Sequence, residues 1–269
     1  MISLPLVYTL LALLAYSTSF CYVVAHFMAK SEPNRWVVGL SVLLGLMLHA
    51  SVLYHDMLTP MGIHYDVFNV LSFTSGFMLL LSLLFSSYRP VLGLTLIAIP
   101  VAATGLILGF ALSQPKLSIT ASSLGLDLHI ILSLSAYTVL FMAAIHAMLL
   151  WFQNRELKKK NKKRVWVNLL PSLQTMESLL FDLLITGFII LTIALGFGFF
   201  TIDNFFAQHL AHKTVFSLMS WWVYAVLLVG HYAFGWRGQK AIRFTLIGFS
   251  LLALGFIGSK FVLEMILSP

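Results

Sequence analysis

The chain has 269 residues, of which 60% are hydrophobic and only 9% are charged, and its net charge is +7. A soluble domain of this length needs far more charged side chains to cover its surface, so this composition excludes a soluble globular fold. The basic residues collect in short segments between apolar runs, which indicates orientation in a membrane rather than a nucleic-acid partner. The only cysteine, Cys21, excludes an intrachain disulfide, a CxxC redox pair and a c-type haem attachment motif.

Apolar runs of about 20 residues recur along the whole chain, and each is long enough to cross a bilayer as a helix. We expect eight transmembrane helices, near residues 4–29, 36–57, 66–86, 91–112, 127–153, 177–201, 214–235 and 243–266. The strongly basic segment QNRELKKKNKKR separates the fifth run from the sixth, and no internal repeat is obvious. The sequence therefore predicts an all-α polytopic membrane protein with a single domain over 1–269 and a cytoplasmic basic loop near 154–176.

Lysine and arginine are distributed unevenly among the connecting segments. The segments after the odd-numbered helices hold thirteen of them, and those after the even-numbered helices hold two, Lys116 and Lys213. Because basic loops stay on the cytoplasmic side, we expect the odd-numbered connections in the cytoplasm and both termini on the outer, periplasmic side.

Two of the expected helices carry a stripe of polar residues on an otherwise apolar surface. In the fifth helix the polar residues are four apart and are His129, Ser133 and Tyr137. In the seventh they are three, four and seven apart and are Ser217, Ser220, Tyr224 and His231. Each set shares one helical face, which should point into the protein or a cavity, because lipid cannot satisfy polar groups. Hydrogen bonds between helices are the alternative for His231, and they are the favoured interpretation for His146.

Other histidines lie near the two membrane surfaces. His26 lies near the inner surface, and His49 lies in the outer half of the second helix. The outer rim gathers a loose, metal-like cluster of His55, Asp56, His64 and Asp66. A separate pair, His209 and His212, has a spacing that suits one metal ion but lacks a third ligand.

Three segments resemble a known family. They are LDLHIILSLSAYTVLFMAAIHAMLLW, LLPSLQTMESLLFDLLITGFIILTIALGFGFF and HKTVFSLMSWWVYAVLLVGHYAFGWRGQKA. They closely resemble the YpjD-type inner-membrane proteins of the cytochrome c assembly group, which includes CcsA, CcmC and HemX. The first four helices agree mainly in number and in the histidine of LMLHASVLY. The resemblance implies a non-enzymatic, multi-pass protein of the bacterial inner membrane that binds non-covalent, b-type haem and serves cytochrome c biogenesis. Its implied partners are the lipid bilayer, haem, and cytochrome c maturation components or another membrane protein.

The resemblance also implies which residues hold haem. His129, before a tyrosine-containing helix, and His231, in a later helix, match the family's haem-iron ligands. The further candidates for binding the cofactor are His49, His26, Tyr137 and Tyr224. The sequence departs from the haem-delivering members in two places: it lacks a WGxxWxWD motif, and its last segment FIGSKFVLEMILSP has no histidine.

Helix depth bears on how these histidines could pair on one iron. Two axial imidazole nitrogens lie about 4 Å apart, since each metal–nitrogen bond is about 2 Å long. His49 and His231 are poor partners by depth, and His49 matches His129 better, with an offset of about 9 Å.

Two other functional classes are alternatives, a transporter and an enzyme. A transporter, or an accessory subunit of one, would use the polar stripes to line a path for a solute or metal, and the outer rim cluster favours it. Paired carboxylates and broken half-helices, which mark ion sites in the middle of a membrane, are not evident. An enzyme is disfavoured because the sequence has no nucleophile–base pair, phosphate loop or metal-hydrolase motif.

Overall fold

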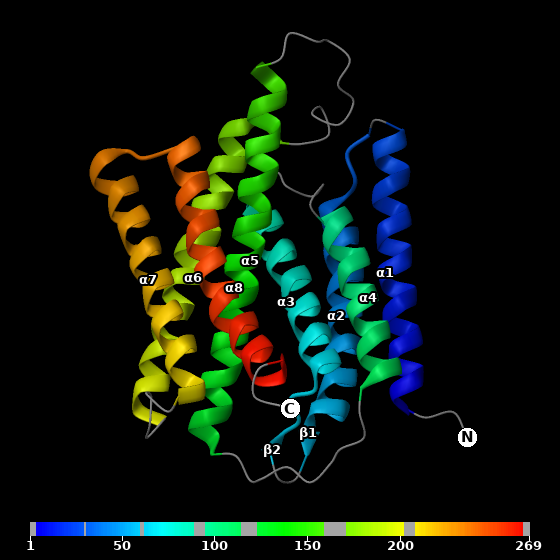
Figure 1. Ribbon diagram of the computed structural model, residues 1–269. Helices are drawn as coiled ribbons and strands as arrows, with labels where there is room; N and C mark the ends of the chain where they lie inside the picture. The colour runs from blue at the N-terminus through cyan, green and yellow to red at the C-terminus, as the bar shows by residue number, and fades with distance from the viewer. Residues whose placement is uncertain are drawn as a thin grey trace. The chain divides into compact units, whose positions relative to one another are not determined.

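The computed structural model describes residues 4–29, 31–59, 62–88, 95–113, 123–158, 171–201 and 208–265, with the backbone alone for 59, 62, 208–212 and 256–265. Its helices are α1 (Leu4–Met28), α2 (Arg35–Met57), α3 (Val67–Tyr88), α4 (Thr95–Leu112), α5 (Leu124–Lys158), α6 (Leu173–Thr201), α7 (Gln208–Phe234) and α8 (Gln239–Met265). A short antiparallel pair of strands, β1 (Leu58–Thr59) and β2 (Gly62–Ile63), follows α2. The eight predicted helices are confirmed over the described residues (Figure 1).

Seven of the helices, α1 to α7, are long and apolar enough to cross a membrane, judged on the described residues. The eighth, α8, has 27 residues. Large apolar side chains are exposed on the outer surfaces of these helices, for example Leu14, Leu40 and Val229. In water such surfaces would be costly, whereas in a bilayer they contact lipid. The chain is therefore a polytopic helical membrane protein, as predicted, and the periplasmic location of both termini stays a prediction.

Capping residues fix where several helices begin. Asn34 accepts a hydrogen bond from the backbone N–H of Trp36 at 3.0 Å, at the start of α2. Ser172 accepts one from the N–H of Thr175 at 3.2 Å, so α6 begins four residues before the predicted 177. Helix α5 runs on to Lys158, past the predicted end at 153, and the basic side chains of its last turn favour a helix C-terminus. The predicted loop near 154–176 is thus helical at both ends, and residues 159–170 lie outside the described part of the chain.

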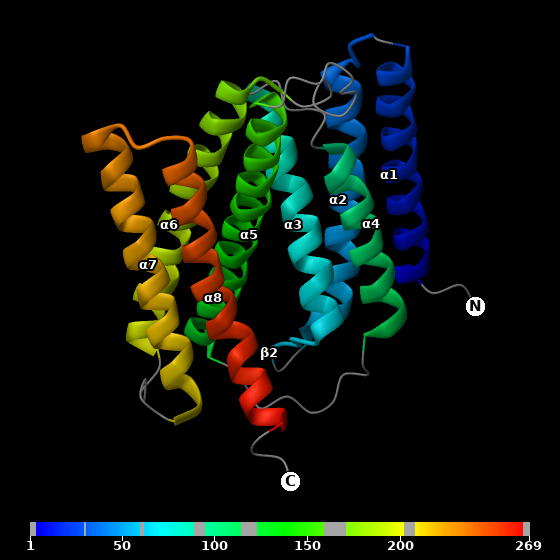
Figure 2. The same ribbon diagram turned by 45° about the horizontal axis from the view of Figure 1, so that its top comes forward.

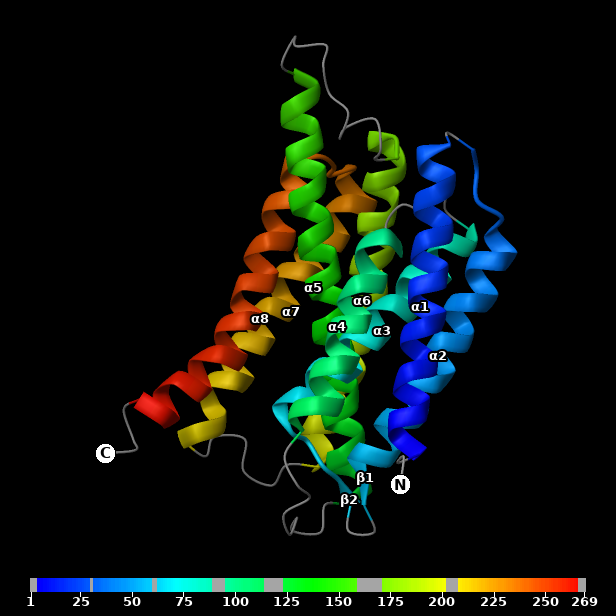
Figure 3. The same cartoon turned by 90° about the vertical axis from the view of Figure 1, so that its right-hand side faces the viewer.

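The contacts within the chain divide it into two compact units, Met1–Ser123 and Leu124–Pro269. In the first unit α1 packs on α2, α2 on α3, α3 on α4 and α4 on α1, so the four helices form a closed bundle (Figure 3). The second unit repeats this neighbour order with α5, α6, α7 and α8 (Figure 2). The single domain predicted for 1–269 stays a prediction.

Small residues set the helix spacing inside each unit. In the first unit, a Cβ on Gly109 of α4 would lie 2.8 Å from the Cβ of Ser72 on α3. In the second, a Cβ on Gly187 of α6 would lie 2.8 Å from Cγ of Leu140 on α5. Such close approach between helices is typical of membrane bundles. The α5–α6 contact fixes an antiparallel register, which decides what faces the polar stripe of α5.

Candidate functional site

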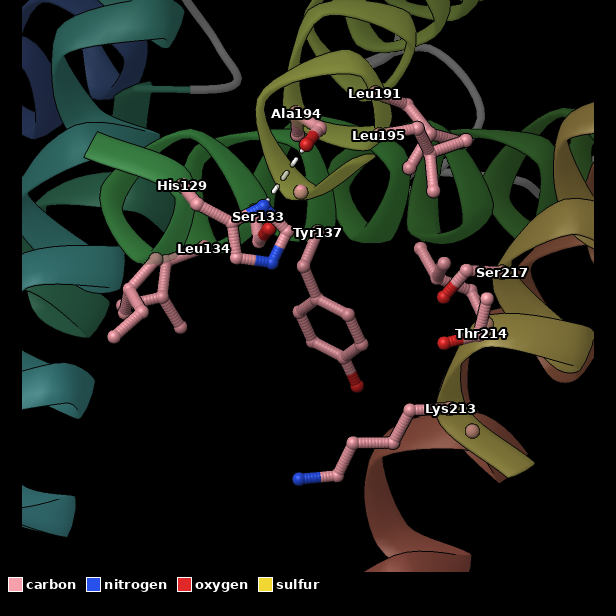
Figure 4. A pocket seen from close by; sticks show the side chains of 14 residues that line it. His129, Ser133, Leu134, Tyr137, Leu191, Ala194, Leu195, Lys213, Thr214 and Ser217 are labelled. Carbon is pink, nitrogen blue, oxygen red and sulfur yellow. Dashed lines mark hydrogen bonds between the residues drawn. The ribbon is translucent and has the colours of Figure 1, made fainter. Parts of the chain in front are cut away.

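A cavity of about 350 Å³ lies among the four helices of the second unit (Figure 4). The polar stripe of α5 lines it with His129, Ser133 and Tyr137, so the face predicted from the four-residue spacing points into a cavity. Leu191 and Leu195 of α6 are among its apolar walls. The size and the apolar lining with a few convergent polar groups are typical of a small-molecule site.

His129 is held in one orientation by α6. Its Nδ1 lies 2.9 Å from the carbonyl oxygen of Ala194, and this nitrogen must donate because a carbonyl only accepts. The proton on Nδ1 leaves Nε2 with a free lone pair, and Figure 4 shows that ring nitrogen on the side away from Ala194. A histidine fixed in this way by a backbone carbonyl is the arrangement found for metal-ligating imidazoles.

Gly198 makes room for that imidazole. A Cβ at position 198 would lie 2.8 Å from Cε1 of His129, which is shorter than real Cβ contacts. Ala194 and Gly198 are four residues apart on α6, so one face of this helix both holds the ring and leaves space for it. The sequence alone does not indicate this role of Gly198, because it depends on the α5–α6 register.

The cavity also has a polar side formed by α5 and α7. Figure 4 shows the hydroxyl of Tyr137 and the ammonium of Lys213 on the same side of the pocket. Lys213 is exposed and lies four residues before Ser217, which also lines the cavity. Sequence reasoning counted Lys213 only as a loop charge, although the i, i+4 spacing to Ser217 places both on one face.

His231 lies away from this cavity. It comes fourteen residues after Ser217, which is about 21 Å along α7 at 1.5 Å per residue. Its ring stacks on Phe181 of α6, with centroids 3.5 Å apart and an interplanar angle of 20°. The structure therefore does not bring His129 and His231 together at one pocket.

The surroundings of His231 form a compact turn between α7 and α8. His231 Nδ1 donates to the carbonyl of Trp236 at 2.9 Å, and the N–H of Trp236 donates to the carbonyl of Gly230 at 3.0 Å. Gly235 has a φ of 64° and donates its N–H to the carbonyl of His231 at 3.0 Å, as expected for a helix closed by an αL motif. Gly238, with a φ of 58°, donates its N–H to Oε1 of Glu177 on α6 at 2.7 Å. These contacts give His231 a structural role that the GWRG sequence could have indicated.

The rest of the α7 stripe binds α8. Ser220 donates to the carbonyl of Gly248 at 2.8 Å, and the hydroxyl of Tyr224 lies 3.5 Å from the carbonyl of Thr245. Tyr224 is fully buried, and a Cβ on Gly248 would lie 2.7 Å from its Cζ. Ser220 and Tyr224 therefore form hydrogen bonds between helices, while Ser217 faces the cavity.

The candidate histidines of the first unit are engaged in hydrogen bonds. His49 is buried, with Nδ1 3.2 Å from the hydroxyl of Tyr16 and Nε2 2.8 Å from Oγ of Ser72. Both ring nitrogens of His49 are thus occupied, and the residue joins α1, α2 and α3. His26 bonds the carbonyl of Tyr22 in its own helix at 2.9 Å and stacks on that tyrosine ring. As cofactor ligands, both stay predictions.

His146 differs from the interhelical hydrogen bond expected for it. It is buried in α5, and its Nε2 has no hydrogen-bond partner among the described residues. The structure gives no physical account of this nitrogen.

The outer rim cluster does not form a metal site. Within the described part of the chain, which includes all four of its residues, no group of three or more His, Cys, Asp or Glu side chains could hold a metal ion. One carboxylate has another role, since Oδ2 of Asp66 accepts the N–H of Phe68 at 3.0 Å at the start of α3. The metal-like interpretation of this cluster was therefore wrong. The side chains of His209 and His212 lie outside the described residues.

Comparison with known proteins agrees with the resemblance of the sequence. A family model described as "Cytochrome C assembly protein" matches residues 4–267. The chain belongs to this family. Membership of the family supports a role in cytochrome c biogenesis. The match covers both four-helix units, not only the second.

Curated relatives of this family member include the Escherichia coli K12 protein named "Inner membrane protein YpjD". It is 33% identical over 264 residues, which cover 97% of this chain and 99% of the relative. An Azospirillum brasilense protein, "Uncharacterized 28.8 kDa protein in nifR3-like 5'region", is 32% identical over 149 residues, or 55% of each chain. No solved structure matches significantly. The predicted inner-membrane location agrees with the name of the E. coli relative and with the helices long enough to span a membrane.

Proposed function

We propose that this family member is a non-catalytic haem-binding protein of cytochrome c biogenesis, located in the bacterial inner membrane. His129 would hold the iron of a non-covalent, b-type haem in the cavity of the second unit. The observation that carries the proposal is the fixed tautomer of His129, whose Nδ1 is bound to Ala194 and whose Nε2 is free beside an apolar cavity.

The residues around the cavity fit haem by their chemistry. A neutral imidazole nitrogen is the commonest protein ligand of haem iron, and a backbone carbonyl on the opposite ring nitrogen raises its basicity. The leucines of α5, α6 and α8 suit the faces of a porphyrin and exclude water from the iron. Attachment is non-covalent because the chain has one cysteine, and that residue lies in α1.

When bound, haem supplies an iron centre, and this chain's part is to hold it. Ala194 fixes the ring of His129, and Gly198 gives the ring its space. His129 is the only imidazole among the described residues that line the cavity, and it is the histidine ligand that these residues offer to the iron. That arrangement supports carriage or hand-over of haem in cytochrome c biogenesis, with other maturation components as partners.

A haem titration tests the proposal. Wild-type protein in lipid nanodiscs is titrated with haem, and we expect a Soret band that saturates at one haem per chain. We expect His129→Ala to weaken haem binding about tenfold or more, because it removes the iron ligand. His26→Ala is the matched control, since it removes an imidazole that bonds only within α1. A wild-type protein that binds no haem, or equal affinities for wild type and His129→Ala, would contradict the proposal.

His231 is tested separately, because it lies away from the cavity and binds the turn between α7 and α8. We expect His231→Ala to retain the Soret band of the cavity site. A titration in which His231→Ala abolishes haem binding and His129→Ala does not would transfer the ligand role to His231. The transporter alternative loses its main support with the outer rim cluster, and no other observation favours it.

A further inference from the structure

The polar side of the cavity contains a lysine, Lys213, that has no acidic partner among the residues the structure describes. Lys213 lines the cavity from the first turns of α7, and Figure 4 shows its ammonium on the same side of the pocket as the hydroxyl of Tyr137. It forms no ion pair with any acidic residue in the described part of the chain, and no aspartate or glutamate is among the described residues that line the cavity. Among the described residues, no acidic side chain neutralises this positive charge at the mouth of the apolar pocket.

An uncompensated cation beside an apolar cavity attracts an anion. Low-polarity walls strengthen the field of such a charge, and an ammonium forms a charge-assisted hydrogen bond with a carboxylate. The ligand that suits this arrangement has an apolar body for the leucine-lined part of the cavity and a carboxylate that reaches its mouth. The hydroxyl of Tyr137, on the same side, is a second donor for that group.

We propose that Lys213 binds a carboxylate of the ligand and makes the cavity select a porphyrin with free propionates over one whose propionates are esterified. This inference rests on the proposed function, since it assigns the ligand to haem. It adds a specificity-determining residue that acts on the carboxylate end and not on the iron. The two ends of the ligand are then recognised by different elements, the iron by α5 and the propionate by α7.

Esterified and metal-free porphyrins separate the two contributions. Dissociation constants are measured in nanodiscs for haem, haem dimethyl ester and metal-free protoporphyrin IX, the last by its own fluorescence. We expect wild type to bind haem about fivefold more tightly than its dimethyl ester, as for a partly exposed ion pair. We expect Lys213→Gln to lose that preference and Lys213→Arg to keep it. Because Lys213 is exposed, both variants should unfold at the wild-type temperature.

The outcomes distinguish the inference from the function on which it rests. If His129 ligates iron but Lys213 does not bind the propionate, wild type will bind haem and its ester equally, and the inference is overturned. If iron ligation fails but the inference holds, metal-free protoporphyrin IX will still bind more weakly to Lys213→Gln than to wild type. Oleate tests the other source of a carboxylate, a fatty acid. If equimolar oleate displaces haem from wild type but not from Lys213→Gln, Lys213 binds a fatty-acid carboxylate, and the proposal is contradicted.

Discussion

At the scale of single residues, the candidate site depends on one imidazole and two backbone positions that face it. Ala194 accepts the Nδ1 proton of His129, and Gly198 leaves the space that the ring occupies. The imidazoles of His49 and His231 have other roles. His49 bonds a tyrosine and a serine hydroxyl, and His231 bonds a backbone carbonyl and stacks on a phenylalanine. What distinguishes His129 is a free nitrogen beside a cavity.

A valine at position 198 tests the space around His129. Its Cβ would lie 2.8 Å from Cε1 of the imidazole, so the ring must turn away from the cavity. We expect Gly198→Val to weaken haem binding about tenfold in the nanodisc titration, because a misplaced ligand loses its bond to iron. The control is Gly196→Val on the same helix, where an added Cβ meets nothing within 4 Å. Equal effects of the two substitutions would contradict this role of Gly198.

Sequence reasoning reached His129 but not the residues that orient it. The four-residue spacing of His129, Ser133 and Tyr137 predicts a shared helical face, because that property is local. The partners Ala194 and Gly198 lie on another helix, and their identity depends on the α5–α6 register, which periodicity does not determine. For the same reason, the sequence could not decide whether His231 faces a cofactor or, as in the structure, Phe181 and the carbonyl of Trp236.

At the scale of elements, the turn between α7 and α8 joins three helices. Glu177 of α6 accepts the N–H of Gly238, while His231 and Gly230 hold Trp236 from α7. Lys240 of α8 lies over the Trp236 ring, 5.3 Å from its centroid. The carbonyls of Gly230 and His231 near the end of α7 thus have donors within the protein.

Removal of the carboxylate acceptor should loosen this turn. We expect Glu177→Ala to lower the free energy of unfolding by about 1–2 kcal/mol, since the N–H of Gly238 loses a charge-assisted hydrogen bond. Glu177→Gln keeps an acceptor oxygen and should cost less than Glu177→Ala. Thermal unfolding of the three proteins in one detergent measures the order. If Glu177→Gln is as unstable as Glu177→Ala, the hydrogen bond to Gly238 does not stabilise the turn.

At the scale of the whole molecule, the chain consists of two four-helix units with the same neighbour order. The number of helices could be predicted because each apolar run is long enough to span a bilayer. The division into two units could not be predicted, because it depends on which helices pack together. All the runs are similarly apolar, so their composition does not select their packing partners. The family match over residues 4–267 indicates that both units belong to the conserved architecture.

The distribution of basic residues predicts how this molecule is oriented. In a Cys21→Ser background, Arg237→Cys should lie in the cytoplasm and Ser123→Cys outside, because basic connections remain inside. We expect a membrane-impermeant maleimide to label Ser123→Cys on intact spheroplasts, and Arg237→Cys only after permeabilisation. The reverse pattern would invert the topology and move the cavity to the other side of the membrane.

The most direct test of the central claim, that Nε2 of His129 binds haem iron, is chemical rescue of His129→Gly by free imidazole. The substitution leaves a space the size of the lost ring, and His26→Gly serves as the matched control. We predict that haem bound to His129→Gly has an altered, weakened Soret band and that millimolar imidazole restores the wild-type spectrum, while His26→Gly has that spectrum from the start. A wild-type spectrum for His129→Gly without imidazole would contradict the account.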